Sequence, residues 1–122
     1  MANTFKVITR DVAPASSGTP ETLYTVQSGS TVVILGLTLA NVHTSQVSAS
    51  VTLVSTTTQT SQTQNTTAHI IKDAPIPVGS SLEIMSGNKI VLQNNGTTGD
   101  VIRATCGTAS SLDVTLSVLE DV

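Results

Sequence analysis

Few residues in this sequence have side chains that could carry out chemistry, and those few lie far apart. A zinc site needs three or four ligands, or a pair at a defined spacing, and His43 and His69 form no HxH or HxxxH pair. The single cysteine, Cys106, has no partner for an intramolecular disulfide. Arg103, a cation that could activate its thiol, would lie on the opposite face of an alternating strand. We therefore interpret both histidines as structural residues and Cys106 as a small, buried apolar side chain.

Residues 94–100, with the sequence NNGTTGD, are rich in side-chain oxygens and superficially resemble a calcium loop. Such a loop needs a series of carboxylates, whereas Asp100 is the only acid here. The Asn-Gly step and the two glycines are typical of a hairpin turn. The sequence also contains no Gly-rich phosphate loop, nucleophile elbow or spaced pair of carboxylates. We expect no metal, no cofactor and no enzymatic activity.

The composition is simple and poor in charge. Ser and Thr make up 36 of the 122 residues, the aromatic residues are Phe5 and Tyr24 alone, and charged residues are 11%, against roughly 25% in an ordinary soluble domain. The net charge is −3 and the five Lys and Arg are scattered, which argues against nucleic acid as a partner.

The N-terminal residues lack the apolar stretch of a signal peptide, and the longest apolar run, Val32–Leu35, is too short to span a membrane. The protein should fold in a reducing cytoplasm and not be secreted.

Apolar residues recur with a period of two, which is the period of a strand with one buried face. The clearest examples are Val47, Ala49, Val51 and Leu53, and Leu112, Val114, Leu116 and Val118. A third set, Val33, Leu35, Leu37 and Leu39, is also expected to face the core. Val and Thr favour strands over helices. The sequence predicts an all-β protein, with residues 1–122 forming a single-domain antiparallel β-sandwich of jelly-roll or immunoglobulin-like type.

Eight or nine short strands are expected. They span Phe5–Val12, Thr22–Val26, Thr31–Ala40, Val47–Thr56, Ala68–Lys72, Ser81–Met85, Lys89–Gln93, Asp100–Thr105 and Leu112–Glu120. The third and fourth are predicted to pair through Asn41–Gln46, and the sixth and seventh to form a tight hairpin through residues 86–88. The segment Asp73–Gly79 contains two prolines and is expected at a sheet edge or at a crossover between sheets.

Residues 56–67 contain no apolar side chain and therefore cannot bury a face. High β propensity of Thr favours a projecting hairpin, and a polar loop is the alternative. We expect this segment to contact a partner by pairing with a neighbouring subunit as an added strand. The candidate partner-binding residues are Thr56, Thr57, Thr58, Gln59, Thr60, Ser61, Gln62, Thr63, Gln64 and Asn65.

Four stretches carry a resemblance to a known family: Thr31–Asn41, Thr44–Ser55, Ile71–Leu92 and Ser111–Glu120. They resemble small virion structural proteins of tailed bacteriophages that infect marine cyanobacteria. The phrase PIPVGSSLEI followed by GNKIVLQ is the most distinctive part, whereas this chain inserts NNGTTG before GDVI. The resemblance implies incorporation into a phage particle and offers no catalytic residues.

The leading functional expectation is a capsid decoration, or cement, protein that binds the outside of the major capsid shell and stabilises it. A neck, tail or head-fibre subunit is the alternative, and a carbohydrate-binding sandwich is disfavoured because sugar sites use exposed aromatic platforms. The expected partners are the major capsid protein or other virion proteins, without nucleic acid or membrane. Low charge also predicts self-association, with a homotrimer as the first expectation and a dimer as the second. The expected location is the virion.

Overall fold

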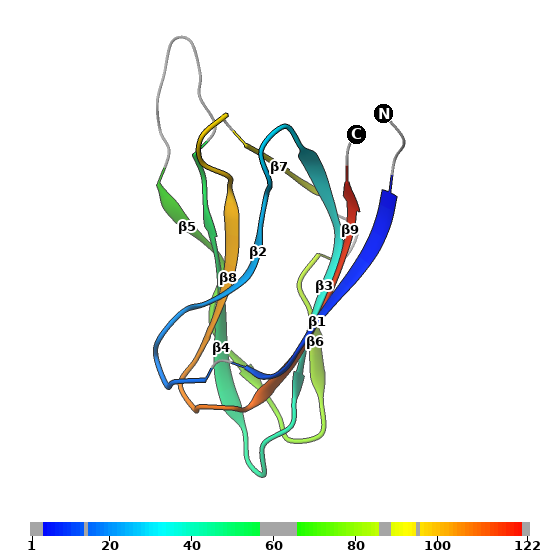
Figure 1. Cartoon of the computed structure of the whole chain (residues 1–122). Coiled ribbons are helices and arrows are strands. Elements are labelled where there is room, and N and C mark those ends of the chain that lie inside the picture. The colour runs from blue at the N-terminus through cyan, green and yellow to red at the C-terminus, as the bar shows by residue number, and fades with distance from the viewer. Residues whose placement is uncertain (1–3, 14, 57–65, 86–88, 95, 121–122) are drawn as a thin grey trace.

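The computed structural model describes residues 4–13, 15–56, 66–85, 89–94 and 96–120, which form two antiparallel sheets packed face to face (Figure 1). Sheet A contains, in spatial order, β1 (Thr4–Ala13), β9 (Leu112–Glu120), β3 (Thr31–Asn41) and β6 (Ser81–Glu83), with β7 (Ile90–Gln93) also paired to β3. Sheet B contains β2 (Glu21–Thr25), β8 (Val101–Cys106), β4 (Val47–Val54) and β5 (Thr67–Ile76). The predicted all-β sandwich is confirmed. None of the described residues forms a helix long and apolar enough to cross a membrane.

The order of pairing is that of one long antiparallel ribbon. β1 pairs with β9, β2 with β8, β3 with β6 and β7, and β4 with β5. The turn of the ribbon is therefore the connection between β4 and β5. The ribbon is wrapped so that β3 also pairs with β9, and β4 with β8. When β6 and β7 are counted as one interrupted strand, this connectivity is that of an eight-stranded jelly roll, the first of the two predicted types.

The core lies between the sheets and is built from aliphatic side chains. The alternating sets of β4 and β9 point inward as predicted: Val47, Ala49 and Val51, and Leu112, Val114, Leu116 and Val118, are all nearly or completely buried. Leu53, the last member of the β4 set, is partly buried and packs against this core. Each of the Val and Leu side chains contributes roughly 1.5–3 kcal/mol when it leaves water. The two strands that show the clearest period in the sequence thus hold the two sheets together.

The prediction for β3 is wrong in its first half. Val32 and Ile34 are buried, and Val33 and Leu35 lie on the outer face. The register against β9 shifts between Ile34 and Gly36, which is a β-bulge that inserts one residue and reverses the alternation. The bulge is supported by Glu83, whose Oε2 accepts a hydrogen bond from the Leu37 N–H at 3.3 Å. Beyond the bulge, Leu37 and Leu39 are buried as predicted.

Two predicted pairings are also wrong. β3 and β4 belong to different sheets, so Asn41–Gln46 carries the chain across the sandwich and does not close a hairpin. β6 and β7 do not pair with each other, because both run antiparallel to β3 along one edge, opposite Thr38–Ala40 and Thr31–Ile34. The predicted turn at residues 86–88 lies outside the described residues. Length and turn composition alone do not distinguish a connection within a sheet from one between sheets.

The proline-containing segment occupies the place that the sequence predicts. Pro75 lies in β5, the edge strand of sheet B, where the missing N–H of proline is tolerated. After Ile76 the chain turns through Pro77–Ser80, with Ser80 N–H bonded to the Pro77 carbonyl at 3.1 Å, and enters β6 in sheet A. Asp73–Gly79 is therefore both an edge and a crossover.

Candidate interaction surfaces

The residues that could carry chemistry are not brought together. His43 lies in the loop between β3 and β4, and His69 is exposed on β5. Cys106, the last residue of β8, is 1% exposed. No group of three or more His, Cys, Asp or Glu that could hold a metal ion occurs among the described residues. The buried position of Cys106 confirms its interpretation as a core side chain.

The loop that resembles a calcium site is a turn held by protein donors. Asn94 and Gly99 form an isolated antiparallel bridge, and Asn94 Oδ1 accepts a hydrogen bond from the Gly96 N–H at 2.8 Å. Asn94 Nδ2 donates to the Val26 carbonyl at 3.0 Å, which ties the turn to the end of β2. The predicted hairpin is wrong, because β7 and β8, which this segment connects, lie in different sheets, and Asn95 of the Asn-Gly step lies outside the described residues.

Asp100 accepts hydrogen bonds from two other segments at this end of the sandwich, a role that the sequence did not reveal. It is 3% exposed. Its Oδ1 accepts hydrogen bonds from the Thr56 N–H at 2.6 Å and the Thr56 hydroxyl at 3.0 Å. Its Oδ2 accepts one from the Gln93 N–H at 3.0 Å. Asp100 therefore joins the ends of β4 and β7, and hydrogen bonds of this charge-assisted kind are the strong ones.

Thr56 is the one member of the ten candidate partner-binding residues, 56–65, that the structure describes, since residues 57–65 lie outside the described residues. The ladder between β4 and β5 continues past Val54 and Thr67 to a hydrogen bond from the Ser55 N–H to the Thr66 carbonyl at 3.2 Å. The segment thus connects two neighbouring antiparallel strands, and its first residue is fixed to Asp100. Its predicted role in partner binding stays a prediction.

An exposed apolar row crosses the outer face of sheet A. The register places Phe5 opposite Leu119, Leu119 opposite Val33, and Val33 opposite Val91. We call these four residues the outer row. Phe5 is 72% exposed and Val91 is 56% exposed, at the two edges of the sheet, while Val33 and Leu119 are partly exposed between them. The outer row exists because the bulge in β3 turns Val33 away from the core.

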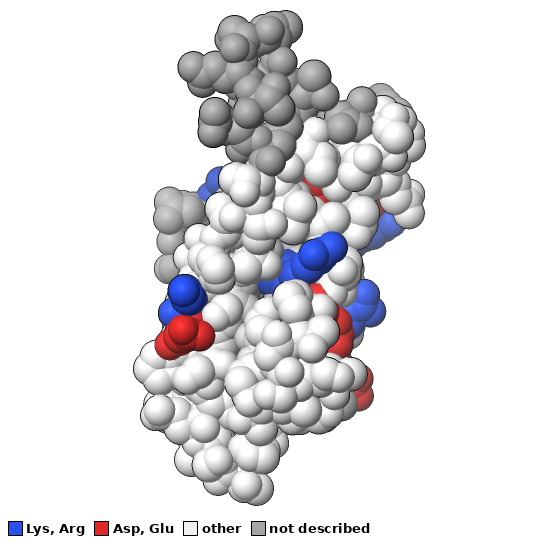
Figure 2. All heavy atoms as spheres, turned by 90° about the vertical axis from the view of Figure 1, so that its left-hand side faces the viewer, with Lys and Arg blue, Asp and Glu red and all other residues white. Residues whose placement is uncertain are grey.

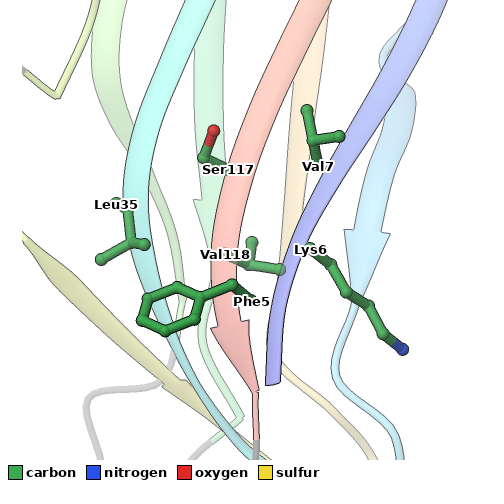
Figure 3. A pocket seen from close by; sticks show the side chains of 6 residues that line it. All are labelled: Phe5, Lys6, Val7, Leu35, Ser117 and Val118. Atoms are coloured by element: carbon green, nitrogen blue, oxygen red, sulfur yellow. The ribbon is translucent and has the colours of Figure 1, made fainter. Parts of the chain in front are cut away.

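A shallow depression of about 350 Å³ lies beside the outer row, lined by Phe5, Lys6, Val7, Leu35, Ser117 and Val118. The Phe5 ring reaches from β1 across β9 toward Leu35 on β3, and Lys6 points the other way (Figure 3). Val7 is 65% exposed beside it. The lining is mostly apolar, with Phe5, Val7 and Leu35 among its members, which suits contact with a protein surface.

The opposite face of the molecule carries few charges. Seen from the side of sheet B, Lys, Arg, Asp and Glu appear as a few spots across the middle of a largely uncharged surface, with red spots next to blue ones in this view (Figure 2). Strand β8 places Arg103 opposite Thr52 and Thr22 on the outer face of this sheet. The scattered cations offer no continuous basic stripe along this view.

A polar trio joins the two sheets between the edge strands β1 and β2. Lys6 Nζ lies 2.8 Å from Glu120 Oε1, and the Tyr24 hydroxyl donates a hydrogen bond to Glu120 Oε2. Hydrogen bonds from Lys6 and then from Tyr24 lower the pKa of Glu120 below its ordinary value of 4.5, against the opposing effect of desolvation. The Glu120 side chain is 17% exposed and that of Lys6 is 54% exposed, so solvent screens this ion pair in part.

Comparison with known proteins does not indicate what these surfaces bind. No family model and no curated protein matches the sequence. Among solved structures, the chain is similar to one from the disulfide-linked pili of Bacillus endospore appendages, with 15% sequence identity and a TM-score of 0.46 over 98% of this chain and 84% of that one. A likeness at this level carries no argument about function.

Proposed function

We propose that the protein is a structural component of a bacteriophage particle, a decoration protein that binds the outside of the major capsid shell and stabilises it. The sequence resemblance to virion proteins of cyanobacterial phages supports this proposal. The charge-poor sandwich, which carries no catalytic or metal-binding cluster among its described residues, agrees with a role in binding proteins.

The observation that carries the proposal is the outer row on sheet A. It crosses β1, β9, β3 and β7 on the outer face of sheet A, and two of its members, Phe5 and Val91, are more than half exposed. Contiguous apolar surface of this kind, with uncharged Ser and Thr around it, marks protein contact surfaces. Binding would also stabilise the protein itself, because a partner that binds the folded state shifts the unfolding equilibrium.

The test is binding of the purified protein to capsids that lack it, taken from a phage whose genome encodes this chain. Val33→Thr with Val91→Thr keeps the shape of the side chains and removes apolar contact from the outer row. We expect at least a several-fold loss of affinity in a sedimentation assay. Val78→Thr is the matched control, since Val78 is 57% exposed in the turn between β5 and β6. Equal binding by all three proteins would contradict the proposal.

The copy number in the particle separates a decoration protein from the alternative. Quantitative mass spectrometry should give a number comparable with that of the major capsid protein. A number that fits a single ring would identify a neck or tail subunit instead, and absence from the particle would overturn both.

A further inference from the structure

Three of the four edges of the sandwich are interrupted. β2 has five residues and a register shift between Thr22 and Tyr24. β5 contains Pro75, two register shifts against β4 and Asp73 at a φ of 50°. The edge formed by β6 and β7 is broken between Glu83 and Ile90. Proline, bulges and short strands are the features that keep an edge from pairing with another chain.

β1 is different. It has ten residues, contains no proline, and pairs with β9 in continuous register from Thr4 to Arg10. It lies at the end of the strand order of sheet A, so no described strand pairs with its other side. The backbone groups on that side form a template on which an extended strand can add.

From these observations we infer that β1 binds β1 of a second copy of this chain, antiparallel and about a two-fold axis at Val7. The axis is placed at Val7 because Val7 is an apolar side chain on this edge strand that is 65% exposed, and because the adjacent registers bring like charges together. In this register Val7 faces Val7 of the second copy, Phe5 faces its Thr9, and Lys6 faces its Ile8. The two exposed Val7 side chains then cover each other.

Repulsion between like charges disfavours the two adjacent registers, which are centred on Lys6 and on Ile8. Residues that face each other in an antiparallel pair lie on the same side of the sheet. The two-fold axis must therefore place one residue of β1 opposite the same residue of the second copy. An axis at Lys6 would place the two Lys6 side chains opposite each other, and an axis at Ile8 would place Lys6 opposite Arg10. Like charges directly opposite are destabilising. With the axis at Val7, each Lys6 keeps its ion pair with Glu120 of its own chain.

The result is a dimer with one continuous sheet across both copies. The contact uses backbone groups of β1. It includes Phe5 of the outer row but does not use Val33 or Val91, the two residues whose substitution tests the proposed role in a virion. Loss of capsid binding and loss of the dimer are therefore separate results.

Disulfide trapping tests both the edge and the register. In Val7→Cys the two introduced thiols face each other at the axis, with Cα atoms about 4.5–5.5 Å apart, which is within disulfide range. In Thr9→Cys the equivalent atoms are offset by four residues, roughly 13 Å along the strands. The natural Cys106 is buried. Under mild oxidation we expect most of Val7→Cys to form covalent dimers on a non-reducing gel, and almost none of Thr9→Cys.

A charge substitution tests the dimer without a covalent bond. Val7→Lys places like charges opposite each other at the axis and should raise the dimer dissociation constant at least tenfold in analytical ultracentrifugation. Thr115→Lys is the control, because Thr115 is exposed on β9, away from the edge. A wild-type protein that stays monomeric at high concentration would overturn the inference, and so would covalent dimers of Thr9→Cys in place of Val7→Cys.

Discussion

Glu120 shows how a single carboxylate joins two sheets at their edges. It lies on β9 in sheet A and receives hydrogen bonds from Lys6 on β1 and Tyr24 on β2. Both partners favour its charged form. Because the pKa of Glu120 is lower in the folded protein than its ordinary value of 4.5, the stabilisation is present above pH 4.5 and is lost as the pH falls through the folded pKa.

We expect Glu120→Gln to lower the free energy of unfolding at pH 7 by no more than about 1 kcal/mol, because Lys6 is half exposed. The difference from wild type should shrink as the pH falls below 4.5. Urea unfolding between pH 3 and pH 7 measures it. Lys6→Met should reduce the same pH dependence, since Lys6 is the largest cause of the shift. A difference that grows toward acid pH would contradict this assignment.

Gly99 is required by a close approach of two backbones. A Cβ atom at this position would lie 2.0 Å from the Val26 carbonyl oxygen. Gly99→Ala should therefore lower the free energy of unfolding by about 1–3 kcal/mol, as overpacking does elsewhere. Gly107→Ala is the matched control, because no atom lies within 4 Å of its added Cβ. Thermal unfolding of the two variants gives the comparison, and equal melting temperatures would show that the turn shifts without cost.

At the residue scale, the sequence indicates that the side chains able to carry chemistry are far apart, but not which side chains hold the structure together. The separation of His43, His69 and Cys106 is visible in the sequence alone. The role of Asp100 is not, because its partners Thr56 and Gln93 are distant or on another strand, and only the wrapped fold brings them to its carboxylate. A lone acid in a polar turn has no periodic signal that could indicate burial.

At the scale of elements, all nine strands are visible in the sequence because alternation and turn residues mark each one locally. Their partners are not, because a strand with one apolar face looks the same in either sheet. The stretch VVILGL in β3 is apolar on both faces, so the alternation itself is ambiguous there. The bulge at Leu35 and Gly36 decides it, and its support comes from Glu83 in another strand.

Strand β9 offers a direct test of which face is the core. Leu116 is completely buried and Leu119 lies in the outer row. Leu116→Ala should lower the free energy of unfolding by about 2–5 kcal/mol, through lost burial and a cavity. Leu119→Ala should cost about 1 kcal/mol or less, as surface changes usually do. Chemical denaturation distinguishes the two, and a larger loss for Leu119→Ala would mean that the assignment of faces is inverted.

The connection between β4 and β5 should tolerate shortening. Residues 56–67 have no apolar side chain to bury, and the described ladder already closes between Ser55 and Thr66. Deletion of Gln59–Gln64 should change the melting temperature by only a few degrees, on the scale of about 1 kcal/mol or less. If the segment binds another virion protein, the same deletion should reduce incorporation into particles. Normal incorporation would identify a solvated loop, and a large loss of stability would place the segment in the body of the sandwich.

At the scale of the whole molecule, the fold is one long antiparallel ribbon wrapped into two sheets. Of the paired strands only β4 and β5 follow each other in the sequence, and they form the innermost pair of the ribbon, whereas β1 pairs with β9 at the outside. No local sequence pattern indicates which strands pair in this way. This pairing arises because two apolar faces must cover each other, and wrapping a long antiparallel ribbon satisfies that requirement with short connections.

The position of β9 has a consequence for how the protein is made. β9 lies between β1 and β3 in sheet A, yet both neighbours leave the ribosome long before it. Until β9 arrives, β1 has no partner in its own sheet, and β3 lacks one of its two sides. Pairing between such distant segments is intrinsically slow, and unpaired strands waiting during translation are prone to aggregate. Efficient production should therefore depend on chaperones that shield the unfinished sheet, and slower translation should increase rather than relieve that dependence.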